Sequence, residues 1–139
     1  MDTAFLRYEF LEHTADIRLC ARGRDLKELF TNAALGMMDY LFGNEVRSSK
    51  PESGDSIELS AHDSESLLID WLSKLLLKSS IEKRAYVKFA IEDLSETHLR
   101  ATIFGTSAVA KEEIKAVTHY DMRIECSGNL LEVTVTFDI

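Results

Sequence analysis

The fold is decided by the last ten residues, Leu130–Ile139, whose sequence is LLEVTVTFDI. Alternate positions are apolar (Leu131, Val133, Val135 and Phe137), and the positions between them are polar or charged. A period of two residues predicts a β-strand with one buried face and one solvated face. Because a sheet of such strands must cover its apolar face, the chain must also supply helices with matching apolar stripes.

Two segments supply these stripes. Apolar residues recur at steps of three and four residues in Leu26–Phe42 and again in Leu67–Leu76, as expected for amphipathic helices. Asp25 precedes the first segment and can cap its helix, and Asp63 or Ser64 can cap the second. Two helices of this kind can cover one face of a sheet.

Other segments with strand periodicity complete the predicted fold. The predicted strands are 17–21, 57–61, 86–94, 98–104, 114–125 and 130–138, of which the third and fourth, and the fifth and sixth, form hairpins. Residues 43–55, between the first predicted helix and the predicted strand 57–61, are polar and predict a surface loop. We therefore predict one α+β domain over residues 1–139: a two-layer α/β sandwich, in which two main helices pack on one face of a largely antiparallel sheet.

The charge balance narrows the classes of partner. The chain has 24 acidic and 16 basic residues and a formal net charge of −8. Strong direct binding to nucleic acid is disfavoured, since Lys and Arg supply most of that affinity. An acidic surface suits binding of a cation or of a basic protein. A monomer is compatible with the sequence, which does not fix the oligomeric state.

Two further features bear on the compartment. No apolar stretch approaches the length of a membrane span, and the first residues do not form a secretory signal. Cys20 and Cys126 lack the spacing of a disulfide framework or a zinc site, and we expect both to be free, buried thiols. These observations favour a cytoplasmic protein without membrane association.

Three short stretches could carry chemistry. Residues 12–17 (EHTADI) form a polar cluster that a local turn could also explain, and residues 114–120 (IKAVTHY) could be a solvated strand. The chain then ends in Asp138-Ile139 on a strong strand, where a terminal carboxylate would lie beside the Asp138 side chain. Oxygen anions held together repel one another unless a cation lies between them, which favours calcium, magnesium or manganese.

These stretches resemble the archease family, and the resemblance covers nearly the whole chain. The family's motifs match His13-Thr14-Ala15-Asp16-Ile17, Gly23 with Leu26-Lys27-Glu28-Leu29-Phe30, Leu67-Leu68-Ile69-Asp70-Trp71-Leu72, Ile114-Lys115-Ala116-Val117-Thr118 and Asp138-Ile139. The family usually has Tyr before His after the fourth motif, whereas this chain has His119-Tyr120. A one-residue exchange moves a strand side chain to the other face, so we assign no role to His119.

The resemblance implies a two-layer α/β protein that binds a divalent cation and assists an RtcB-type RNA ligase in tRNA splicing. Its metal ligands would be Asp16, Asp138 and Ile139, with calcium favoured for the isolated protein and magnesium or manganese as alternatives. His13, Lys115 and Thr118 are further motif candidates. The resemblance also implies that the protein promotes guanylylation of the ligase and its multiple turnover, without catalytic machinery of its own.

Two other functions stay open. The sequence has no phosphate-binding glycine loop, no nucleophile elbow and no zinc-ligand spacing. A stand-alone metal-dependent hydrolase would have to use Asp16 and Asp138 as ligands and His13 as base. A general chaperone or modulator of nucleic-acid-processing proteins would need an exposed apolar patch.

Overall fold

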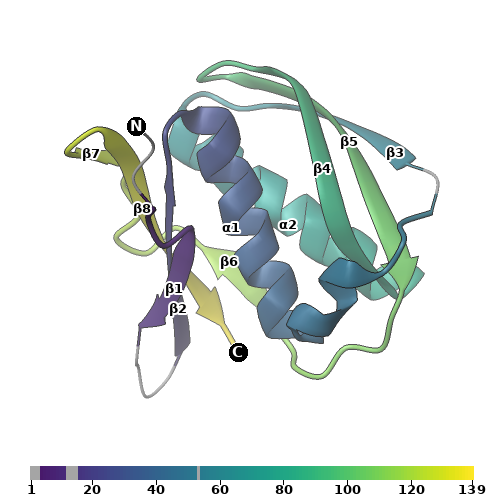
Figure 1. Ribbon diagram of the computed structural model, residues 1–139. Helices are drawn as coiled ribbons and strands as arrows, with labels where there is room; N and C mark the ends of the chain where they lie inside the picture. The colour runs from purple at the N-terminus through teal and green to yellow at the C-terminus, as the bar shows by residue number, and fades with distance from the viewer. Residues whose placement is uncertain (1–3, 12–15, 53) are drawn as a thin grey trace.

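A computed structural model describes residues 4–11, 16–52 and 54–139 (Figure 1). In this part of the chain the elements are β1 (Tyr8–Leu11), β2 (Asp16–Gly23), α1 (Leu26–Phe42), the 3-10 helix η1 (Asn44–Ser48), β3 (Gly54–Ser60), α2 (Ser64–Glu82), β4 (Arg84–Leu94), β5 (His98–Ser107), β6 (Ala116–Thr118), β7 (Glu125–Ser127) and β8 (Leu130–Asp138). The α+β class is confirmed.

The described strands form two antiparallel sheets, where the sequence predicted one. The five-stranded sheet has the order β1-β2-β8-β6, with β7 paired to the other end of β8, and the three-stranded sheet has the order β3-β5-β4. Helix α1 packs on β2 and also on β4, and α2 contacts β6, β3 and β4. The helices therefore lie between the sheets and cover one face of each (Figure 1). Alternation identifies a buried face but not which strands pair, so it could not reveal this division.

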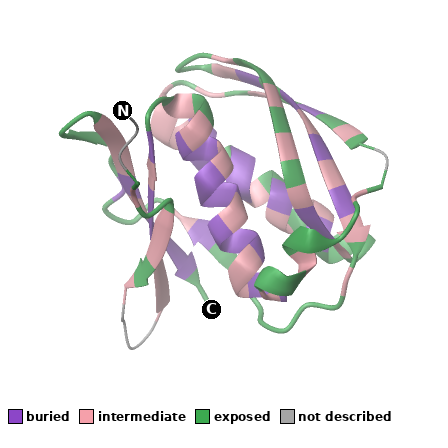
Figure 2. Cartoon of the chain, in the orientation of Figure 1, coloured by how far each residue is buried: buried purple, intermediate pink, exposed green. Residues whose placement is uncertain are grey.

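The core lies along the helices, as the buried residues in Figure 2 show. Trp71 of α2 is fully buried, and its Nε1 donates a hydrogen bond to the Phe30 carbonyl of α1 at 3.1 Å. Its ring meets Phe89 of β4 edge to face, with the centroids 5.8 Å apart. One side chain thus joins both helices to the three-stranded sheet.

Both helices are capped by the predicted aspartates, Asp25 and Asp63. The Asp25 carboxylate accepts a hydrogen bond from the Glu28 amide at 2.8 Å, and Asp63 accepts one from the Ser66 amide at 2.7 Å. Ser64, the alternative cap of the second helix, is instead its first helical residue. An acceptor at this position satisfies an amide that has no partner within the helix.

The continuous strand predicted over residues 114–125 is wrong. In this segment only β6 and β7 pair with β8, and the residues between these two short strands form a turn. Asp121 has a φ of 47°, which no strand accommodates, and the Met122 amide donates to the His119 carbonyl at 3.3 Å. Met122 of this turn is buried in the core. Its apolar side chain continues the alternating pattern, and for this reason the sequence pattern predicted a strand.

Three smaller expectations also need correction. Tyr8–Leu11 forms β1, where we predicted no strand, and five residues of the predicted loop form η1. Arg47 of η1 binds the Asp39 carboxylate of α1, with Nε and Oδ1 2.8 Å apart. Cys20 is buried as predicted, but Cys126 is exposed because β7 is a short strand at the rim of the sheet.

Candidate functional site

One face of the five-stranded sheet is polar and turned away from the helices. Residues of β2 and β8 lie directly opposite one another, and alternate pairs carry the polar side chains. These four pairs, which we term the polar face, are Asp16 with Asp138, Arg18 with Thr136, Cys20 with Thr134, and Arg22 with Glu132. The intervening pairs, such as Leu19 with Val135, are buried in the core. Core packing therefore determines which residues the polar face presents.

The two predicted metal ligands meet at the end of this face. Asp16 is half-buried, Asp138 is exposed, and they are cross-strand partners. Side chains at such positions have their Cβ atoms roughly 4.5–5.5 Å apart. On its other side Asp138 faces Ala116 of β6, whose methyl group adds no charge. Two carboxylates at this spacing repel one another, which a cation between them would relieve.

Residues of the fourth motif hold this end of the sheet in place. The Lys115 amide donates to the Asp138 carbonyl at 2.7 Å, and the Thr118 hydroxyl donates to the Thr136 carbonyl at 2.9 Å. The side chain of Lys115 is exposed, and Ile139 is 40% exposed directly after Asp138. His13 lies outside the described residues. The structure thus brings four of the candidates, and Ile139, to one end of the sheet around β8.

The oxygen atoms at this end suit a hard cation. No group of three or more His, Cys, Asp or Glu side chains that could hold a metal occurs within the described ranges. The carboxylates of Asp16 and Asp138 would therefore need main-chain oxygens, such as that of Ile139, and water to complete the coordination. Such a donor set fits calcium, magnesium or manganese better than zinc.

At the opposite end of the polar face, the charged side chains pair with one another. The Arg22 guanidinium binds Glu132 at 2.8 Å and Glu9 of β1 at 3.1 Å. Beside it, burial raises the pKa of the Cys20 thiol, so this group stays protonated at neutral pH. Arg22 and its two carboxylates therefore neutralise one another at this end, whereas two carboxylates face one another at the aspartate end.

Sequence reasoning missed Arg18, which lies between these two ends. It follows Asp16 by two residues, so the period of two could have placed it on the same face. Arg18 also borders a hollow of about 330 Å³ whose other walls include Thr134, Asp121 and Arg123. The hollow extends the polar face beyond the aspartate pair.

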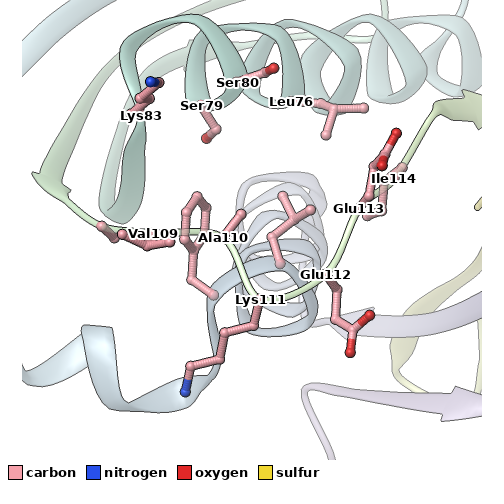
Figure 3. A pocket seen from close by; sticks show the side chains of 13 residues that line it. Leu76, Ser79, Ser80, Lys83, Val109, Ala110, Lys111, Glu112, Glu113 and Ile114 are labelled. Atoms are coloured by element: carbon pink, nitrogen blue, oxygen red, sulfur yellow. The ribbon is translucent and has the colours of Figure 1, made fainter.

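A second concavity has a mainly apolar surface and lies at the C-terminal ends of α1 and α2 (Figure 3). This pocket of about 680 Å³ lies between the last turns of α1 and α2 and the segment 108–114. Leu76 and Val109 contribute apolar walls and Ser79 a hydroxyl group, whereas the Lys111 side chain extends away from the pocket (Figure 3). The segment is fixed by Lys111 and Glu112, whose amides both donate to the Leu41 carbonyl.

None of the described helices is both long enough and apolar enough to cross a membrane.

Comparisons with known proteins agree over most of the length. The model of the archease protein family matches residues 8–139. The archease of Methanosarcina acetivorans is 36% identical, with 96% of each chain covered, and that of Sulfurisphaera tokodaii is 30% identical, covering 96% of this chain and 99% of its own.

Solved structures extend the comparison to the fold. The solution structure of Methanobacterium thermoautotrophicum protein 1598 has a TM-score of 0.76 and 30% identity, covering 96% of this chain and 99% of its own. The crystal structure of a Thermotoga maritima archease, described as a possible chaperone, has a TM-score of 0.65 at 22% identity, covering 99% and 100%, and shares the fold. The sequence matches and the fold together place this chain in the archease family.

Proposed function

We propose that the protein is an accessory factor that activates an RtcB-type RNA ligase, promoting its guanylylation and multiple turnover while holding a divalent cation. The observation that carries the proposal is the pairing of Asp16 with Asp138 at the exposed end of β2 and β8. The choice of an RtcB-type ligase as the partner rests on the family resemblance. The net charge of −8 supports docking on a basic protein surface.

Each residue at the aspartate end has a distinct task in this proposal. Asp16 and Asp138 bind the cation, which when bound neutralises negative charge on phosphate groups in the ligase's active site. Hydrogen bonds from Lys115 and Thr118 to the β8 backbone hold Asp138 in register. The protein thereby adds a fixed charge to a site where the ligase supplies the reacting histidine, which is a positioning and electrostatic effect.

A guanylylation assay tests this function. Asp16→Asn and Asp138→Asn remove charge with little change in shape, and Asp70→Asn, at an exposed position on α2, is the matched control. We expect each site variant to lose most of the stimulation of the ligase and the control to keep it. Full stimulation by both site variants would show that the aspartate pair plays no part.

A stand-alone hydrolase receives less support. Its candidate base, His13, lies outside the described residues, and no group of three or more metal-binding side chains occurs within them. If the protein were a hydrolase, the purified chain with magnesium or manganese would turn over nucleotides or phosphoesters without a ligase. Absence of turnover in a preparation that binds the cation would eliminate this alternative.

The apolar pocket favours a second candidate, a general chaperone. Val109 at its margin is 88% exposed, and Ile81 on α2 is 69% exposed, so apolar surface is available to a client chain. A related protein from Thermotoga maritima is described as a possible chaperone. If this function holds, the protein suppresses aggregation of an unfolded client, and Val109→Asp abolishes the effect while Asp138→Asn leaves it intact.

A further inference from the structure

In the part of the chain that the structure describes, Arg18 is a half-buried cation without a counter-ion. Among the described residues it forms no ion pair or hydrogen bond, and its Nε atom is buried. The hydroxyl oxygen of Thr136, its cross-strand partner, is also buried without a hydrogen-bond partner, in a residue only 4% exposed. Arg22, two residues further along, binds two carboxylates. Because buried polar atoms in native proteins nearly always have partners, the Arg18 Nε atom and the Thr136 hydroxyl oxygen are exceptions, and neither is open to solvent. The remaining N–H groups of the half-buried Arg18 guanidinium are the ones that an oxygen atom from outside the chain can approach.

The surroundings of Arg18 point to a particular kind of molecule. Two residues along a strand advance by roughly 7 Å, so the backbone positions of Arg18 and Asp16 are close enough for one polyphosphate to contact both side chains. Beyond Arg18 the hollow of about 330 Å³ is lined by Arg123 and by three carboxylates, those of Asp121, Glu125 and Glu132. Carboxylates accept hydrogen bonds from hydroxyl groups, such as those of a sugar, but repel phosphates. Phosphate therefore fits at Arg18, and a sugar fits in the hollow.

We propose that Arg18 binds a phosphate of a nucleotide polyphosphate whose neighbouring phosphate contacts the cation held by Asp16 and Asp138. The inference rests on the proposed function and adds a ligand class to it: the accessory protein itself binds the metal complex of a nucleoside triphosphate. A guanidinium suits this task because it donates paired hydrogen bonds to phosphate oxygens. The polar face is then a nucleotide surface that begins at the aspartate pair and ends at the hollow.

Calorimetric titration of the purified protein tests the proposal. The probes are magnesium-GTP, pyrophosphate with magnesium, pyrophosphate in EDTA, and guanosine, which has no phosphate. The variant is Arg18→Gln, and the control is Arg100→Gln, at an exposed position on β5 of the other sheet. We expect Arg18→Gln to raise the Kd of the phosphate-containing probes roughly ten- to a hundred-fold, as for loss of a charged hydrogen bond, and Arg100→Gln to leave it unchanged.

The readouts separate this proposal from the proposed function. Binding of manganese alone should be the same in Arg18→Gln as in the wild type, because Arg18 is not a metal ligand. Binding of pyrophosphate in EDTA tests Arg18 alone, because EDTA removes any cation that the aspartates would hold. If Asp138→Asn still stimulates the ligase but Arg18→Gln loses pyrophosphate, the proposed function fails and the phosphate site stands. Equal affinity of Arg18→Gln and wild type for every probe, or no binding of magnesium-GTP at millimolar concentration, would overturn the inference.

Discussion

Asp138→Asn should make the protein more stable in EDTA and less stable than the wild type when a divalent cation is present. In EDTA the substitution removes repulsion between the opposed Asp16 and Asp138 carboxylates. Two unit charges 5 Å apart repel by about 0.8 kcal/mol in bulk water and by about 3 kcal/mol at an effective permittivity of 20. Because Asp138 is exposed, we expect a gain near the lower limit, about 1 kcal/mol.

The cation reverses the order of stability. A cation that binds only the folded chain stabilises it by about 2.7 kcal/mol at a concentration one hundred times its Kd. Asparagine at position 138 removes one of the two charged ligands, so the variant should gain far less. Its backbone is retained, since the hydrogen bond from Lys115 is accepted by the main-chain carbonyl of residue 138.

Urea denaturation followed by circular dichroism measures both effects. The wild type, Asp138→Asn and the control Asp70→Asn are unfolded at pH 7 in EDTA and in calcium, magnesium or manganese. The control removes the same charge from an exposed position on α2, so it reports the effect of net charge alone. The reasoning is wrong if Asp138→Asn is less stable than the wild type in EDTA, or if cations stabilise both proteins equally.

Three further predictions concern the helices. Trp71→Ala should lower the free energy of unfolding by roughly 3–5 kcal/mol, since it empties a fully buried site, and a loss below about 1 kcal/mol in a urea titration would contradict the packing. Asp25→Ala should cost about 1 kcal/mol in the same assay, because the Glu28 amide loses its acceptor. Hydrogen bonds from Ser66 lower the pKa of Asp63 below its ordinary value of 3.8, so the stability from this cap is present above pH 3.8 and is lost as the pH falls through the lowered pKa. Asp63→Asn, which keeps an acceptor but does not titrate, should flatten that acid dependence in melts recorded below pH 3.8.

Local patterns predicted the elements that depend on local physics. The alternation in β8 and the stripes of α1 and α2 appear in the structure because burial of a periodic face fixes the type of element. Asp25 and Asp63 were predictable as caps because an N-cap acts within three residues. Asp16 and Asp138 were candidates through the family motifs and the adjacent anions, and the structure shows that they are cross-strand partners.

Features that depend on distant pairing were beyond the sequence. The division into two sheets follows from which edges meet, and the spacing of apolar residues does not record it. The turn at Asp121 resembled strand because buried Met122 continued the alternation. The two-residue period of a strand could place Arg18 on the polar face. That Arg18 has no counter-ion among the described residues depends on its neighbours across the sheet, where Thr136 faces it, and these are not adjacent in sequence.

The register between β2 and β8 makes the aspartate pair a consequence of the core. A slip of one residue would turn Phe137 to solvent, but a slip of two would keep the apolar face and separate Asp16 from Asp138. Gly23 opposes such a slip, because a Cβ there would lie 2.4 Å from the Leu29 amide nitrogen, so only glycine lets the end of β2 approach α1 this closely. The Asn32 side chain adds a hydrogen bond to the Arg22 carbonyl at 2.7 Å. With β8 held by Lys115 and Thr118, both strands are fixed from opposite sides, so the two carboxylates face one another whether or not a cation is bound.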